Sequence, residues 1–352
     1  MASMALARLT SRKLLRMNGP DCYPYLQGLL CNDLRYLYEP DRVPKRKHAN
    51  NSMNSLSTFM LNPQGRAICD LLLYRTPMTR YECEFTPPGK AKEDDELWIE
   101  CDSSLADGIA NTLYGYRVRR KISVKMENSY SIWCLYPDFE EKSDESVSRH
   151  DGDLAKFNLP LKNELVSYEL TIVHDPRLRI LGARILANSD DTDNLKKRLD
   201  SLFNTNIRKT SSKHYALYRY HIGVGEGVKD LLESTSLPLE CNADYLGSVS
   251  FDKGCYLGQE LTARIRYTGV IRKRLMPIKL DKQTRDESLP ILQGTNIVDK
   301  IKGKKVGTVR HIIDDRGLAL IRHDFGDSEP DLIHPDTDTR LSTYVPFWWK
   351  HN

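Results

Sequence analysis

The chain reads Lys253-Gly254-Cys255-Tyr256-Leu257-Gly258-Gln259-Glu260 within a longer segment, residues 238–274, that has neither helical nor strand periodicity. The glycines near the cysteine permit unusual backbone angles and the close approach of a ligand or partner. Basic residues lie close by in the sequence, at Lys253, Arg264, Arg266 and Arg272. Positive charge favours the thiolate form of a cysteine, which is both its nucleophilic and its metal-binding form. The segment therefore predicts that Cys255 is a functional residue held at the surface.

The remaining cysteines lack the closely spaced pairs from which zinc and iron–sulfur sites usually draw their ligands. The chain contains no CxxC spacing, and no apolar signal-peptide core precedes these residues. We expect them to be reduced thiols of an intracellular compartment, mostly buried as small hydrophobic side chains. They are Cys22, Cys31, Cys69, Cys83, Cys101, Cys134 and Cys241.

Length and composition indicate a globular protein of two or three domains, because 352 residues exceed what one hydrophobic core usually supports. Hydrophobic residues make up 40% of the chain and charged residues 28%, which argues against a fibrous or disordered protein. The net charge of +4 predicts no nucleic-acid partner, and the basic cluster at 42–48 is interpreted as a solvated loop. No apolar run approaches the roughly 18 residues of a membrane-spanning helix.

The first twenty residues carry four basic side chains and no acid, a composition typical of a mitochondrial transit peptide. However, residues 14–17 followed by Asn18-Gly19-Pro20-Asp21 also fit a strand and a turn that leads into a helix. We place this stretch in the folded protein and expect a transit peptide to lie upstream of it.

Hydrophobic periodicity predicts an α+β protein. Helices are expected over residues 21–34, 105–115, 191–203 and 212–221, and strands over 68–74, 97–99, 118–126, 130–136 and 178–186. The turn chemistry of Leu61-Asn62-Pro63-Gln64-Gly65 predicts a hairpin before the strand at 68–74. From about Val270 the pattern changes to short strands, which predicts a small β-barrel or sandwich; these strands are expected at 271–280, 295–301, 306–313, 318–323 and 340–345.

The octapeptide 253–260 closely resembles the signature of the YgfZ-type proteins, whose mitochondrial member is an iron–sulfur cluster assembly factor. Shorter matching pieces extend over most of the chain: Leu26-Gln27-Gly28-Leu29 with Asn32-Asp33, the run Leu61 to Arg66, Asp175-Pro176-Arg177 with Leu181-Gly182, and Gly269 with Arg272-Lys273-Arg274. The family is similar in fold to the T-protein, the aminomethyltransferase of the glycine cleavage system. The sequence departs from the family at 40–55, where an insertion replaces a short turn.

This resemblance implies an α+β fold of three domains around a central folate-sized pocket. Residues 6–55 with 155–268 would form a discontinuous first domain that carries the octapeptide. Residues 56–154 would form an intervening α+β domain, and residues 269–352 a C-terminal β-barrel.

The resemblance also implies a role for Cys255, as a thiolate ligand of a 2Fe-2S cluster. Such a cluster normally needs four protein ligands, so three would come from a partner, an A-type iron–sulfur carrier that forms a heterodimer through the bridging cluster. The expected function is the maturation of 4Fe-4S proteins in the mitochondrial matrix, without turnover of the chain's own. The motif residues Lys253, Gly254, Tyr256, Gly258, Gln259 and Glu260 would shape the loop.

A folate-dependent aminomethyl transferase is the alternative of the enzyme class, with tetrahydrofolate as its cofactor. In this reading Glu240 would contact the pterin, and Arg272 or Arg274 the folate carboxylates. The T-protein has a catalytic aspartate where this chain offers Asp102 or Asp107, neither of which matches the position unambiguously. A third alternative is a scaffold that docks partners through its C-terminal barrel.

Overall fold

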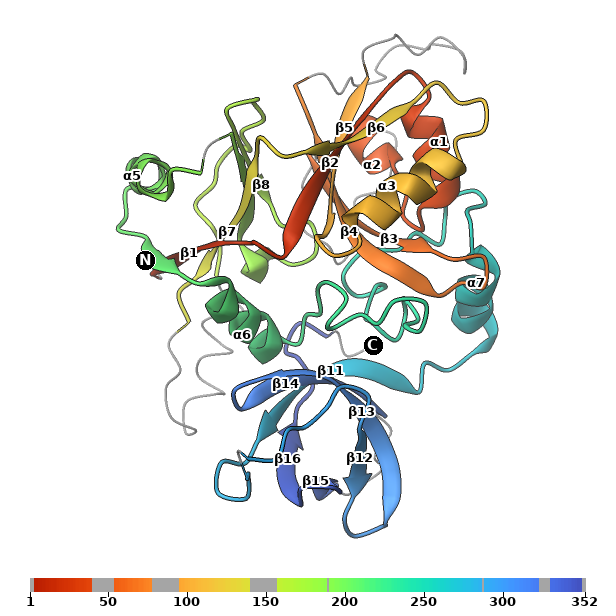
Figure 1. The fold of residues 1–352 in the computed structure, drawn as a ribbon, viewed down its shortest axis with the longest axis vertical. Coiled ribbons are helices and arrows are strands. Elements are labelled where there is room, and N and C mark those ends of the chain that lie inside the picture. The colour runs from red at the N-terminus through yellow and green to blue at the C-terminus, as the bar shows by residue number, and fades with distance from the viewer. Residues whose placement is uncertain are drawn as a thin grey trace.

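The computed structural model of the protein describes residues 3–39, 54–77, 95–139, 157–188, 190–286, 288–322 and 330–349. Two five-stranded sheets lie side by side above a closed barrel (Figure 1). The basic cluster at 42–48, most of the insertion at 40–55 and Cys83 lie outside the described residues.

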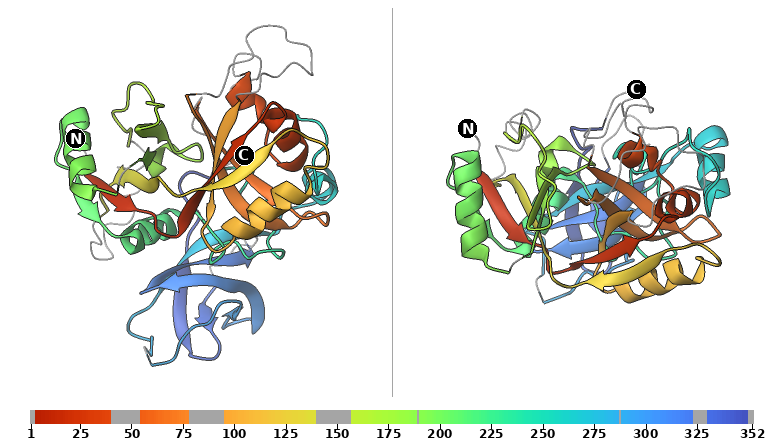
Figure 2. Two further views of the ribbon diagram at one scale, coloured as in Figure 1. Left: turned by 45° about the horizontal axis from the view of Figure 1, so that its top comes forward. Right: turned by 90° about the horizontal axis from the view of Figure 1, so that it is seen from above.

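The first sheet has helices on both faces because its strands direct apolar side chains alternately to one face and to the other. Ala5 and Ala7 of strand β1 face the core that helix α6 covers, whereas Met4 and Leu6 face the core that helix α5 covers. Figure 2 shows α5 running along the outer side of this sheet. In spatial order the strands are β10 (Arg208–Thr210), β1 (Met4–Arg8), β7 (Ser131–Pro137), β9 (Ala183–Ala187) and β8 (Leu170–His174); the helices are α5 (Thr192–Phe203) and α6 (Ser212–Ile222).

The second sheet is buried on both faces along β3, β4 and β5, whereas its edge strand β6 is partly exposed. Leu15 and Ile99 contact the core that contains helices α1, α2 and α3, whereas Leu14 and Trp98 belong to the core shared with the first sheet. In spatial order its strands are β3 (Ser55–Leu61), β4 (Ala67–Arg75), β5 (Glu96–Asp102), β2 (Arg12–Asn18) and β6 (Ser123–Glu127); the helices are α1 (Cys22–Leu29), α2 (Arg35–Tyr38) and α3 (Ala106–Gly115).

The division of the strands between the two sheets does not follow the boundaries at 55 and 154 that the resemblance implies. Strand β2 comes from the predicted first domain but pairs with β5 and β6 of the intervening segment. Conversely, β7 comes from the intervening segment but pairs with β1 and β9. The chain therefore crosses between the sheets twice. It crosses at residues 9–11, between β1 of the first sheet and β2 of the second, and at residues 128–130, between β6 of the second sheet and β7 of the first.

The C-terminal part is the β-barrel that the sequence predicted. Its six strands close antiparallel, and Met276, Ile278 and Val309 are among the side chains of its core. The short strand β15 was not predicted. In barrel order the strands are β11 (Lys273–Leu280), β14 (Arg316–Arg322), β13 (Lys304–Ile313), β12 (Asn296–Asp299), β15 (Leu332–His334) and β16 (Thr339–Thr343).

Three predicted elements are shorter than expected. Helix α1 ends at Leu29 because Leu30 is extended, with ψ at 147°. The predicted strand 178–186 begins with the 3-10 turn η3 (Arg179–Leu181) and pairs only after Gly182, whose φ of +72° breaks the strand. The predicted strand 118–126 pairs only from Ser123, since residues 116–119 form a turn.

Candidate functional site around Cys255

Cys255 lies on an exposed loop between the irregular segment that follows helix α6 and helix α7 (Gln259–Thr268). The other six cysteines that the structure describes are buried. Burial raises the pKa of the Cys101 and Cys241 thiols to about 12, which disfavours their thiolates. Among the described cysteines, Cys255 alone presents its sulfur to solvent. We call residues 253–258 the motif loop.

Lys253 anchors the motif loop to the end of α1. Its Nζ donates hydrogen bonds to the main-chain oxygens of Gln27 at 2.7 Å, Leu30 at 2.7 Å and Asn32 at 2.8 Å. These carbonyls belong to the helix end and the turn after it, where the last carbonyls of a helix lack intrahelical partners. Burial lowers the pKa of Lys253 to about 8. The ammonium group is thus directed to main-chain oxygens, and its role is to position the loop.

Gly258 fixes the other end of the motif loop. Its φ is +79°, and a Cβ at this position would lie 2.5 Å from the Asn62 oxygen and 3.1 Å from the Gly65 Cα. Gly65 has a φ of +78°, and its own Cβ would lie 2.8 Å from the Gly258 oxygen. Both glycines therefore meet backbone to backbone, and the β3–β4 hairpin turn (residues 62–66) packs against the start of α7.

Tyr256 and Leu257 complete the attachment. Tyr256 is buried in a core that includes Cys31 and Leu61, and Leu257 N donates to the oxygen of Gly28 at 3.0 Å. Gln259 Oε1 lies 3.3 Å from the Tyr256 amide. Glu260, in the first turn of α7, is exposed. The residues around Cys255 are held by neighbours while the cysteine itself remains open.

Gly254 differs from Gly258. A Cβ at Gly254 would meet no atom within 4 Å, and its φ lies outside the left-handed region. The fold of this chain places no steric demand for glycine at 254. A glycine beside the exposed thiol instead leaves space for a group from outside the chain.

The predicted folate residues fall into different environments. Glu240 is half-buried, and burial raises its pKa although Lys273 and Arg310 oppose that shift. Arg272 is exposed. Arg274 is buried and paired with Asp244 at 2.8 Å, and it also donates to the Leu239 oxygen at 3.0 Å. The Arg274 guanidinium joins the segment before the motif loop to the barrel.

The two candidate catalytic aspartates, Asp102 and Asp107, lie in different environments. Asp102 is buried at the end of β5, where Oδ1 accepts from the Ser104 amide at 2.9 Å and Oδ2 from the Val228 amide at 3.1 Å. Asp107 is exposed in the first turn of α3. Asp102 therefore holds the chain at residues 227–228. This occupied carboxylate is a poor candidate for proton transfer to a bound substrate.

A buried cluster of charged side chains links the two sheets, and no charge pattern in the sequence predicts it. Arg184 of β9 pairs with Glu226 and lies 3.9 Å from Glu100 of β5. Glu226 also accepts from Arg177 at 2.7 Å. We call it the ion-pair cluster; it comprises Arg12, Asp70, Glu100, Asp175, Arg177, Arg184 and Glu226. The matching piece Asp175-Pro176-Arg177 was the one available signal.

Several proteins are similar to this chain over nearly its whole length. The mitochondrial iron-sulfur cluster assembly factor IBA57 of Mus musculus is 32% identical over 350 residues, which cover 97% of this chain and 84% of that protein. The chain belongs to the IBA57 family. The IBA57 protein of Homo sapiens, also named mitochondrial, is 31% identical over 99% of this chain and 86% of its own length. These relatives confirm the predicted family resemblance.

Two further comparisons concern the fold of this IBA57 family member. Residues 272–351 match the family model described as the CAF17 C-terminal beta-barrel domain. A crystal structure of the glycine cleavage system aminomethyltransferase T from Bartonella henselae covers 99% of this chain with a TM-score of 0.65, at 13% identity, and the match spans 87% of that protein. The predicted α+β, T-protein-like fold with a C-terminal barrel is confirmed.

The described residues contain neither a membrane-spanning helix nor a cluster of metal ligands. None of their helices is both long and apolar enough to cross a membrane. Nowhere in the described ranges do three or more His, Cys, Asp or Glu side chains gather so that they could hold a metal ion.

Proposed function

We propose that this chain is a mitochondrial iron–sulfur cluster assembly factor of the matrix that offers Cys255 as one ligand to a 2Fe-2S cluster. The observation that carries the proposal is the exposed thiol on a loop that Lys253 and Gly258 fix at both ends. The Mus musculus and Homo sapiens relatives are named iron-sulfur cluster assembly factors, which supports the general role. The cluster is cargo, and it serves the maturation of 4Fe-4S proteins.

A partner must supply the remaining ligands, because one thiolate holds only one of the roughly four positions that such a cluster needs. We propose that this partner is an A-type carrier protein, bound as a heterodimer around the cluster. On transfer, Sγ gives its proton to solvent and forms a bond to iron, in place of a ligand that leaves that iron. The open space beside Gly254 gives the cluster room to approach.

The test uses an A-type carrier loaded with a 2Fe-2S cluster. Mixed with the wild type it should form a coloured heterodimer on size-exclusion chromatography, and Cys255→Ser should form none. Cys134→Ala is the matched control, since it removes a buried thiol in the first sheet and should leave the complex intact. A coloured complex of the same yield with Cys255→Ser would refute the proposal.

The folate-dependent alternative can be tested separately by calorimetry with tetrahydrofolate. Glu240 is the residue that remains suited to a pterin, because a half-buried carboxylate can accept from paired N–H groups. If it binds folate, Glu240→Gln should weaken binding while Cys255→Ser should not. Turnover that is indifferent to Cys255 would favour the enzyme over the assembly factor.

A further inference from the structure

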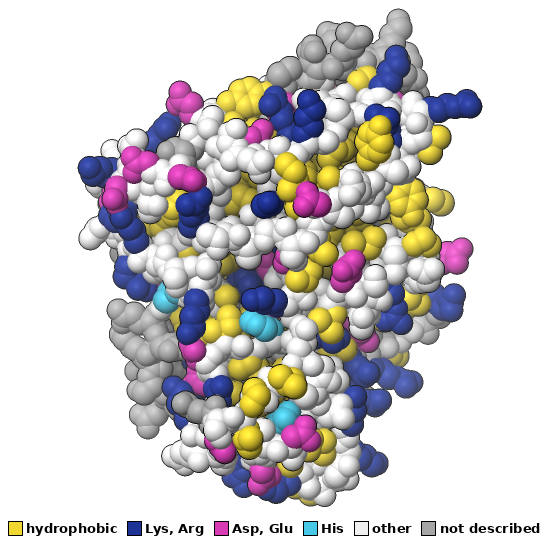
Figure 3. All heavy atoms as spheres, in the orientation of Figure 1, with side chains coloured by type: hydrophobic (Ala, Val, Ile, Leu, Met, Phe, Trp, Pro, Cys, Tyr) yellow, Lys and Arg dark blue, Asp and Glu magenta, His cyan; other side chains and the backbone are white. Residues whose placement is uncertain are grey.

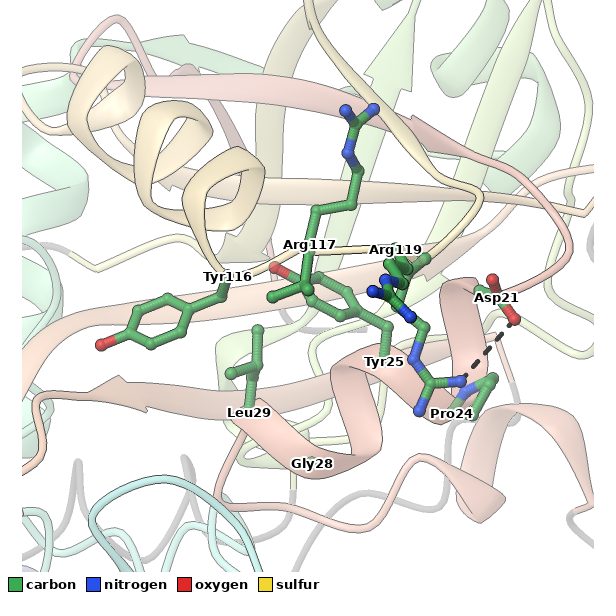
Figure 4. A pocket seen from close by; sticks show the side chains of 10 residues that line it. Asp21, Pro24, Tyr25, Gly28, Leu29, Tyr116, Arg117 and Arg119 are labelled. Carbon is green, nitrogen blue, oxygen red and sulfur yellow. Dashed lines mark ion pairs between the residues drawn. The ribbon is translucent and has the colours of Figure 1, made fainter.

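An open groove lies between helix α1 and the segment that follows α3. Its volume is about 540 Å³. Figure 4 shows Tyr25 and Leu29 on the side of α1, opposite Tyr116 and Arg117 from the other wall. The groove is open rather than enclosed, a form that suits a peptide segment better than a small molecule.

The groove is strongly basic. Arg117, Arg119 and Arg120 line it, and Asp21 is the acidic residue among its lining side chains. Asp21 is itself engaged, 3.8 Å from Arg120 and accepting from the Lys121 amide at 2.7 Å. The groove thus carries an excess of positive charge that an acidic segment would complement.

Apolar side chains stand exposed between these arginines. Tyr116 is 43% exposed, and Val118 is 82% exposed with a φ of +51°. A β-branched residue in the left-handed region is strained, and such strain is concentrated at functional surfaces. Figure 3 shows Lys and Arg next to hydrophobic side chains at the upper right, over α1 and α3. The combination is typical of a protein-binding surface.

The groove adjoins the Cys255 site. Gly28 lines the groove, and its oxygen accepts the hydrogen bond from Leu257 in the motif loop. Leu257 also packs against the core beneath α1. The groove and the motif loop therefore meet at Gly28 of α1.

We propose that the groove binds an acidic segment of the same protein that completes the Cys255 cluster. An apolar side chain of that segment would pack against Tyr116 and Val118. This inference rests on the proposed function. It assigns the groove the docking step, which precedes and does not require the cluster. The arginines accelerate and orient the encounter, and Cys255 then receives the iron.

The test measures binding of the cluster-free A-type carrier by calorimetry, at low and high salt. The double variant Arg119→Glu/Arg120→Glu should weaken binding at least tenfold at low salt and reduce the salt dependence. Lys304→Glu/Lys305→Glu on β13 makes the same charge change on an exposed part of the barrel and should bind as the wild type does. Equal affinities for all three proteins would overturn the inference.

A photo-cross-linking residue in place of Val118 identifies the occupant. Peptide mapping should place the cross-link in a segment of net negative charge in the carrier; a cross-link to a second copy of this chain, or none to the carrier, would overturn the inference. The two proposals fail differently. If Cys255→Ser forms the coloured complex, the proposed function fails even where the groove binds, whereas wild-type affinity of the groove variant leaves Cys255 as a ligand and removes only the docking role.

Discussion

Gly65 and Gly258 pack backbone against backbone, although 193 positions separate them in the sequence. Each has a positive φ, and a Cβ on either would lie within 3.1 Å of the other's main chain. This contact joins two segments that the sequence presents as unrelated turns. It places the exposed Cys255 between a fixed glycine and the Lys253 anchor.

The two motif glycines should respond differently to alanine. Gly258→Ala should lower the free energy of unfolding by about 1–3 kcal/mol, because the left-handed backbone and the contact with Asn62 are both incompatible with a Cβ. Gly254→Ala should leave stability near the wild type but impair the coloured complex, since its Cβ enters only the open space beside the thiol. Urea unfolding measures the first effect. Equal destabilisation by both substitutions would contradict the assignment.

Cys255 should be the most reactive of the described thiols. Mass spectrometry after brief alkylation of the native protein should find label on the Cys255 peptide before the peptides of the six buried cysteines. Unfolding the protein should abolish this difference. Early labelling of Cys31, which is buried against Thr58 and the Ser248 oxygen, would show that the loop is not held as described.

The ion-pair cluster should make stability depend on pH. Burial alone would raise the pKa of Glu226, but Arg184 and Arg177 outweigh it and hold the pKa well below its usual value. Below about pH 4.5 the unfolded chain binds a proton at this residue that the folded chain does not, so stability should fall as the pH falls.

Glu226→Gln is the variant that isolates this effect. It should cost about 3–5 kcal/mol at pH 7, because it removes the buried carboxylate that Arg184 and Arg177 share and leaves Arg177 with Asp175 alone. It should also flatten the loss of stability in acid. Asp190→Asn removes an exposed carboxylate from its pair with Arg8 and should change little. An unchanged acid profile in Glu226→Gln would argue against the assignment.

Substitutions of Arg274 and Arg272 distinguish a structural role from a contact with folate. Arg274→Ala should lower stability by about 2–4 kcal/mol, because it removes the partner of Asp244 and the contact with the Tyr245 ring, 4.1 Å from the guanidinium carbon. Arg272 is exposed, so Arg272→Ala should leave stability near that of the wild type. Thermal unfolding measures both. A folate affinity that falls with Arg274→Ala at unchanged stability would argue for the folate contact and against a purely structural role.

The sequence by itself determined the local features of this protein. Turn chemistry predicted the hairpin of β3 and β4. Hydrophobic periodicity predicted helices α5 and α6 and the short strands of the barrel, because these signals depend on neighbours a few residues apart. Glycine and charge around Cys255 singled out one cysteine of eight. The exposure of that thiol agrees with this prediction.

Only the tertiary structure decided which distant segments meet. Strand β2 could join either sheet by its pattern, and its pairing with β5 and β6 depends on the whole topology. The position of Lys253 two residues before Cys255 predicts that its charge favours the thiolate. In the structure its ammonium group is directed to carbonyls at the end of α1. Hydrogen bonds between residues more than two hundred positions apart leave no periodic trace in a single sequence, so the anchoring of Cys255 could not be predicted from it.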